Sequence, residues 1–347
     1  MTDDTVKNPS LASAAGRPAD EWLSQPDAKA ACTPREGMCC TVFRVRHGES
    51  WVETLNEPPS WELFQKRPAF FGNPMLFPFA YRIADNSFVY RGKRCAITPG
   101  REGFAMHGIV RDLPFRLGRR WEDDAGSHIE ATWTQEAGAV DQQGAQVFPR
   151  YPFPFELTTT YTLLGKTLTN LYQVTNTGSE PLPMAPGIHP YFKLPLFADS
   201  EFSDYRLSST SAYQGGMRLE PEGSAENLDL RQGRRLDAYF DAGASPRGAI
   251  LVLHQQPDVD PQASPDDEGG ATWRLVDTRH DLAIDVQASA GFPYVLDFSP
   301  PSREILSPVF SACHPRAFDM LTEGDSTAVV EVAPGQTWRA WVRITAG

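Results

Sequence analysis

The sequence predicts an all-β protein built as a large antiparallel β-sandwich. Apolar and polar residues alternate over many short runs, which is the period of half-buried strands. The 30 prolines and 27 glycines supply turns between these runs. No segment carries the longer apolar period of an extended amphipathic helix. Hydrophobic residues make up 41% of the 347 residues, so the chain can form a sizeable core.

The clearest strands lie in the middle of the chain and at its end. The runs F-E-L-T-T-T-Y-T-L and T-L-T-N-L-Y-Q-V flank the turn Leu164-Gly165-Lys166 and predict a β-hairpin. Further alternating runs are T-V-F-R-V-R, L-A-I-D-V-Q-A and T-W-R-A-W-V-R-I. The last of these is expected to pair with A-V-V-E-V across residues 333–336. Trp273, Trp338 and Trp341 fall within such runs and are predicted to be core or edge residues.

Two segments do not fit the strand pattern. Residues 1–40 are rich in Ala, Ser, Asp and Pro without a sustained period, so we expect a flexible N-terminal tail. Residues 41–347 then form one domain. Within it, the run Q-Q-P-D-V-D-P-Q-A-S-P-D-D-E-G-G predicts an exposed acidic loop, because strands resume on both sides.

Net charge and cysteine content limit the classes of partner and the cellular compartment that we expect for this protein. A net charge of −12, without a basic stretch that interleaves with aromatics, disfavours nucleic acid and anionic membranes as partners. The start M-T-D-D-T-V-K-N lacks the features of a secretory signal, and no apolar run is long enough for a membrane span. Five cysteines without a C-x-x-C pair predict reduced thiols in a cytoplasmic protein. A neutral small molecule suits this balance.

Two histidines are candidates for chemistry. His189 lies in G-I-H-P-Y-F, where Gly187 permits close approach to a ligand and the following proline rigidifies the chain. The aromatic residues after it offer an apolar face to a sugar ring. His107 lies in A-M-H-G and is also followed by glycine. Either histidine alone could be an ordinary strand or loop residue, but the pair indicates a binding site. A metal site is not expected, because neither H-x-H nor H-E-x-x-H occurs.

Four stretches together resemble one family, the aldose 1-epimerases (galactose mutarotases). They are N-P-M-L-F-P-F-A-Y-R-I, M-H-G-I-V-R-D, the long run from Y-P-F-P-F-E-L to G-I-H-P-Y-F-K-L, and the closing V-A-P-G-Q-T-W. They span about residues 41 to 345, and the third is the most specific. The resemblance implies a large β-sandwich, the supersandwich fold, which agrees with the strand pattern.

The resemblance also implies a mechanism. In the family, a carboxylate takes the proton of the anomeric hydroxyl while a histidine protonates the ring oxygen. The ring opens, C1–C2 rotates, and the ring closes on the other face. By position, His189 matches the general acid, His107 matches a second site histidine that bonds the sugar, and Arg82 and Asp237 match residues that bind sugar hydroxyls. A cofactor is not implied, and the protein is expected to be a monomer or homodimer.

The chain departs from the family at the base. The family has glutamate followed by proline on a late strand, whereas here the run F-S-P-P-S-R-E-I-L-S-P-V-F places Ser307 there. A serine without a base beside it cannot take the anomeric proton at neutral pH. Glu304, Asp319 and Glu323 are the nearby candidates. Glu304 lies three residues earlier, so on a regular strand it would point to the opposite face.

Three functions follow as hypotheses. The first is an aldose 1-epimerase, a mutarotase of carbohydrate metabolism that acts on a free hexose or related sugar. The second is a carbohydrate-binding protein that has lost its base. The third is a hexose-6-phosphate 1-epimerase, which needs cations near the site to bind phosphate. The available cations are Arg91, Lys93, Arg94 and Lys193.

Overall fold

The computed structural model describes residues 20–66, 70–99, 103–136, 151–216, 228–245, 248–257 and 263–347. Antiparallel ladders build both of its large sheets. The predicted all-β fold is therefore confirmed. Within these ranges, every helix is too short or too polar to cross a membrane.

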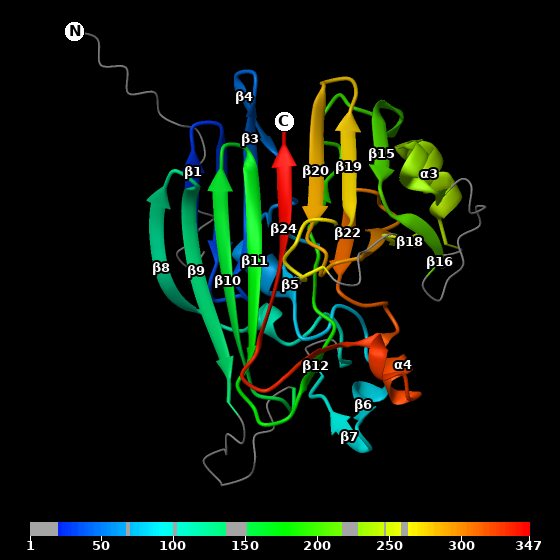
Figure 1. The fold of residues 1–347 in the computed structure, drawn as a ribbon. Coiled ribbons are helices and arrows are strands. Elements are labelled where there is room, and N and C mark those ends of the chain that lie inside the picture. Colours follow the sequence, from blue (N-terminus) through cyan, green and yellow to red (C-terminus); the bar gives the residue numbers. More distant parts are fainter. Residues whose placement is uncertain are drawn as a thin grey trace.

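The largest sheet has nine strands and lies across the front of the molecule (Figure 1). Its order is β17 (Arg234–Arg235), β15 (Tyr205–Ser209), β19 (Thr272–Asp277), β20 (Leu282–Ala288), β24 (Thr337–Ala346), β11 (Thr167–Asn176), β10 (Phe155–Leu164), β9 (Gly126–Gln135) and β8 (Arg116–Asp123). The hairpin of β10 and β11 is the predicted one, with Leu164 paired to Thr167. Gly165 in its turn has a φ of +56°, which glycine adopts without strain.

A second sheet packs behind the first (Figure 1). It contains the strand that directly precedes His189 and the strand that contains Ser307. Its path runs through β16 (Ala212–Gly216), β18 (Ile250–Gln255), β21 (Tyr294–Ser299), β22 (Ile305–Ser311), β13 (Gly187–Ile188) and β5 (Met75–Leu76), and β14 (Phe192–Lys193) also pairs with β22. The Phe192 ring stacks on Trp273 of β19, with centroids 5.4 Å apart. Such contacts between the two layers form the core of the sandwich.

Smaller elements complete the chain. A four-stranded sheet contains β1 (Glu21–Gln25), β2 (Ala28–Thr33), β3 (Cys39–His47) and β4 (Ser50–Glu53). Two-stranded sheets pair β6 (Ser87–Tyr90) with β7 (Lys93–Ala96), and β12 (Leu182–Met184) with β23 (Val330–Val332). The α-helices are α1 (Trp61–Lys66), α3 (Leu236–Gly243) and α4 (Ala317–Thr322), and single 3₁₀ turns cover Ala84–Asn86, Val110–Asp112, Phe202–Asp204, Leu230–Gln232 and Ser326–Ala328.

The predicted tail is wrong for residues 20–40. Strands β1 and β2 pair there, with Leu23 opposite Ala30, and both of these side chains are fully buried. Strand β2, A-K-A-A-C-T, is built mainly from small residues, so it lacks the large apolar side chains that make a strand visible in the sequence. Residues 1–19 lie outside the described part of the chain. So does the middle of the predicted acidic loop, although β18 and β19 do lie on either side of it.

The predicted pairing of the last two strands is also wrong. The turn itself forms, since the Gln336 amide donates to the Ala333 carbonyl at 3.0 Å. However, β23 pairs with β12, whereas β24 lies between β11 and β20. The two strands thus pair in different sheets, with partners that are distant in the sequence. The residues of the turn do not indicate such partners.

A polar cluster in the core links four elements. Asp297 of β21 is fully buried and accepts hydrogen bonds from Tyr239 of α3 at 2.6 Å and from the Trp273 indole at 3.0 Å. His254 of β18, also fully buried, lies 3.3 Å from the same carboxyl group. The predicted burial of Trp273, Trp338 and Trp341 is confirmed. All five cysteines are buried and unpaired, as expected of reduced thiols.

Tyr239→Phe is expected to lower the free energy of unfolding by about 1–3 kcal/mol, because it removes a hydrogen bond to a buried carboxyl group. Denaturant unfolding measures the change. Tyr172→Phe is the matched control: Tyr172 is equally buried, but its hydroxyl makes no hydrogen bond in the described structure. It should be neutral or stabilising. Equal losses in the two variants would contradict this account of the cluster.

Candidate functional site

His189 directly follows β13, the short strand between β22 and β5. Its neighbour Gly187 is required by close packing, since a Cβ there would lie 2.6 Å from the Phe310 carbonyl oxygen and 2.8 Å from Ala80 Cβ. Any larger residue would push β13 away from β22. The glycine noted in the sequence therefore serves strand packing, and through it the placement of His189.

The His189 ring is held by a short chain of hydrogen bonds. Its Nδ1 lies 2.5 Å from Ser307 Oγ on β22, and that hydroxyl donates to the Pro190 carbonyl at 2.5 Å. His189 is 4% exposed. Ser307, which the sequence motif aligns with the glutamate expected from the resemblance, is thus in direct contact with the candidate acid.

His107 lies in a loop with unusual backbone geometry. Its φ is +59°, a region that non-glycine residues rarely adopt, and Gly108 follows with a φ of +75°. A Cβ on Gly108 would lie 2.2 Å from the Phe77 carbonyl oxygen, so only glycine fits. This geometry aims the imidazole at Ala80, whose carbonyl accepts from Nδ1 at 2.7 Å. Strained backbone of this kind is concentrated at functional sites.

Ala80 brings the two histidines together. The Ala80 carbonyl accepts a hydrogen bond from His107, and the Ala80 amide donates to the Ala185 carbonyl at 2.8 Å. The Ala80 Cβ packs against Gly187. As a result, the rings of His107 and His189 meet edge to face with centroids 5.3 Å apart. The structure thus joins the two residues that the sequence analysis singled out, although they are far apart along the chain.

Both imidazoles are held in the neutral form at pH 7. Burial, and then the nearby Arg111 cation, lower the pKa of His107 to about 4, against a smaller opposing effect from the Ala80 carbonyl. Burial is also the main cause that lowers the pKa of His189 well below 6.5, followed by His107 and Arg111. Arg111 stands in the same M-H-G-I-V-R-D motif as His107, but the motif alone did not predict its effect on the two histidines.

Aromatic rings pack around His189. Tyr191 stacks on it with centroids 4.1 Å apart and an interplanar angle of 22°. Phe298 of β21 meets it nearly at right angles, at 6.0 Å. Phe70 contacts both of these aromatic residues. The ring is therefore fixed by packing as well as by hydrogen bonds.

Arg82 and Asp237 occupy other surroundings. Arg82 is exposed, and its guanidinium lies 4.8 Å above the Phe104 ring. Asp237 lies in the first turn of α3 and forms an ion pair with Arg235. In the described part of the chain, neither side chain bonds to His107 or His189. Their predicted role in binding sugar hydroxyls stays a prediction.

The three candidate bases show no contact with His189 in the described structure. Glu304 is exposed just before β22, while Asp319 and Glu323 each lie near Arg316, at 3.7 and 3.0 Å. On β21, Asp297 and Phe298 alternate, so the Asp297 carboxyl group lies in the core behind the site. Nor does any group of three or more His, Cys, Asp or Glu residues in the described ranges form a metal site.

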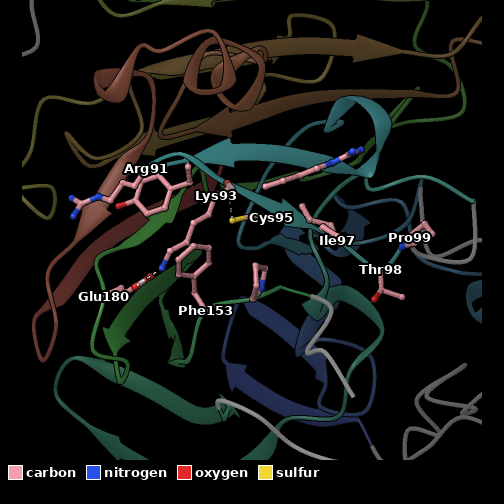
Figure 2. Close-up of a pocket in the computed structure, with 12 residues that line it drawn as sticks. Arg91, Lys93, Cys95, Ile97, Thr98, Pro99, Phe153 and Glu180 are labelled. Atoms are coloured by element: carbon pink, nitrogen blue, oxygen red, sulfur yellow. Dashed lines mark hydrogen bonds and ion pairs between the residues drawn. The ribbon is translucent and has the colours of Figure 1, made fainter. Parts of the chain in front are cut away.

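The cations considered for phosphate binding gather elsewhere. Arg91, Lys93 and Arg94 line a pocket of about 690 Å³ beside β7, which Figure 2 shows with Phe153 and Glu180. Lys93 bonds to Glu180 at 2.9 Å, and Arg91 bonds to Glu331 at 3.0 Å. The residues that line this pocket do not include His107 or His189. The fourth cation, Lys193, forms an ion pair with Glu53 at 3.0 Å.

Comparison with known proteins agrees with this fold. A galactose mutarotase-like protein from Clostridium acetobutylicum superposes with a TM-score of 0.74 and 18% identity, over 95% of this chain and 98% of its own. A putative aldose 1-epimerase from Escherichia coli K12 gives a TM-score of 0.69 and 17% identity, over 95% and 99%. These structural matches establish the shared fold.

Sequence comparison extends the resemblance. The plasmid-encoded protein LacX of Lactococcus lactis subsp. lactis is 29% identical over 148 residues, which is 42% of this chain and 45% of LacX. The match thus spans less than half of that relative. A family model described as aldose 1-epimerase, in contrast, matches residues 39–345. Because this match covers nearly the whole domain and includes both site histidines, the chain belongs to the aldose 1-epimerase family.

Proposed function

We propose that this protein interconverts the α and β anomers of a hexose or a related sugar by opening and closing the ring, with His189 as general acid. Family membership supports the reaction type. The observation that carries the proposal is the pair of histidines, whose rings are held 5.3 Å apart by close packing and by hydrogen bonds to the Ala80 carbonyl and the Ser307 hydroxyl.

The protonation state of His189 determines whether it can act as an acid. As a general acid it must first gain a proton, since its pKa lies well below 6.5 and the ring is neutral at pH 7. Once protonated, an imidazolium with a depressed pKa releases its proton readily to the ring oxygen. His107 supplies a second neutral imidazole beside it, which suits a hydrogen bond with the sugar.

The second candidate function is carbohydrate binding without turnover. It is supported by the sequence alignment of Ser307 with the family's glutamate and by the contacts of His189, which include no carboxylate in the described structure. A hexose 6-phosphate as substrate has weaker support. Of the four cations considered, three line a separate pocket and the fourth is paired with Glu53.

Replacement of His189 by Gln is expected to lower the rate at which fresh α-glucose or α-galactose approaches its equilibrium optical rotation by ~10²-fold or more, because proton transfer by a placed side chain contributes on that order. Polarimetry with purified protein measures the rate. His128→Gln is the control, since His128 is similarly buried but stacks on Trp121 of β8 at the sheet edge. If the native protein accelerates none of a panel of aldoses, the proposed activity is excluded.

Calorimetry separates the candidate functions. For an epimerase, an aldose that binds should also be turned over, whereas saturable binding without any change in optical rotation would identify a binding protein. Glucose and glucose 6-phosphate are to be compared side by side. We expect glucose to be the better ligand, because the cations of the separate pocket already bond to carboxylates. A clear preference for the phosphate would reverse this assignment.

A further inference from the structure

We propose that His189 moves the proton alone: its Nε2 takes the proton from the anomeric oxygen O1 and returns it to the ring oxygen O5, while Ser307 is the positioning residue that keeps Nε2 unprotonated. This inference rests on the proposed epimerase function. It replaces the family's pair of carboxylate and histidine by one imidazole.

The directions of two hydrogen bonds fix which nitrogen of His189 carries the hydrogen. The Ser307 hydroxyl has a single hydrogen, and the Pro190 carbonyl 2.5 Å away can only accept one. The hydroxyl therefore donates to Pro190 and presents a lone pair to His189 Nδ1, also 2.5 Å away. Nδ1 must carry the hydrogen of that bond. In a neutral imidazole the other nitrogen, Nε2, is then the base.

His189 is also held in place by its backbone and by an aromatic neighbour. Its backbone amide donates to the Pro74 carbonyl at 3.2 Å, and Tyr191 stacks on its face at 4.1 Å. Within the described ranges, Nε2 makes no hydrogen bond. The nitrogen that carries the lone pair is therefore the one left for a substrate.

Among the described residues, the face of β21 and β22 that carries Phe298 and Ser307 has no charged side chain. Phe298 pairs with Ser307 and Leu296 pairs with Val309, so these side chains share one face of β21 and β22. Ser311 continues this face and bonds to the Tyr81 hydroxyl at 3.0 Å. None of these groups can accept a proton at neutral pH, which leaves the imidazole as the base on this face.

The step balances without a second group. Nε2 takes the hydrogen of O1, the O1 electrons form the C1=O1 bond, and the C1–O5 bond breaks with its electron pair on O5. The imidazolium then gives its Nε2 hydrogen to O5. One nitrogen can serve both oxygens, because O1 and O5 are bonded to the same carbon. After rotation about C1–C2, the reverse sequence closes the ring on the opposite face.

The nearby charges favour the second half of this transfer. Arg111 and His107 lower the pKa of His189 further than burial alone, so the imidazolium is short-lived and a strong proton donor. The cost is a weaker base in the first half. We therefore expect an acceleration near the lower end of what general acid–base catalysis provides, ~10²-fold.

The tautomer is tested directly by nitrogen-15 NMR of histidine-labelled protein, with the His189 signals assigned from the spectrum of His189→Gln. We expect the Nδ1–H form in the native protein and in Ser307→Thr, which keeps the hydroxyl. Ser307→Ala should shift the ring towards Nε2–H and lower kcat while KM changes little. A native Nε2–H form would overturn the proposal.

The pH profile gives a second test. If neutral His189 acts first as a base, kcat/KM should be constant above about pH 6.5. It should then decrease as the pH falls through the lowered pKa of His189, because the protonated ring cannot accept the proton of O1. An acid that starts protonated would instead lose rate as the pH rises, and that result would exclude the single-imidazole transfer. If the protein turns over sugar but shows a native Nε2–H tautomer or a rate that falls as the pH rises, only the single-imidazole transfer is excluded. If neither the native protein nor any variant turns over sugar, the epimerase function is excluded as well.

Discussion

The close approach of β13 to β22 and to the segment around Ala80 is the constraint on which the site depends. Gly187 allows it, since a Cβ there would collide with both neighbours. With the backbones this close, His189 reaches Ser307, and the Ala80 carbonyl stands where His107 can donate to it. The positive φ of His107 is tolerated because this packing over-determines the loop. Each contact of the histidine pair follows from that one approach.

Burial without a carboxylate gives the site its electrostatic character. In many enzymes an acidic partner raises the pKa of a histidine, but here desolvation and a cation act together to lower it. A chain with a net charge of −12 has thus excluded negative charge from the described contacts of its candidate catalytic residue. Ser307 accounts for the missing negative charge beside His189. The resemblance predicts a glutamate at this position, whereas serine supplies a neutral hydroxyl whose only hydrogen goes to the Pro190 carbonyl.

Strand β21 shows how one element serves stability and function at once. Its alternation sends Asp297 into the core, where Tyr239 and Trp273 satisfy its oxygens, and sends Phe298 against His189. A carboxyl group lies one residue from the aromatic wall of the site and yet on the wrong face to act there. A shift of one residue in the pairing with β22 would exchange these roles, which is why register matters at this strand.

The sequence by itself determined the all-β class, the β10–β11 hairpin, both histidines and the serine at the expected base position. Alternation, turn residues and motif order are local signals, so they survive without a structure. Only the tertiary structure decided that residues 20–40 form paired strands, that β23 and β24 separate, and that Arg111 affects both histidines. It also decided the tautomer of His189, because the hydrogen-bond chain through Ser307 to Pro190 joins residues more than a hundred positions apart. Such contacts depend on how closely two backbones approach, and no local pattern encodes that distance.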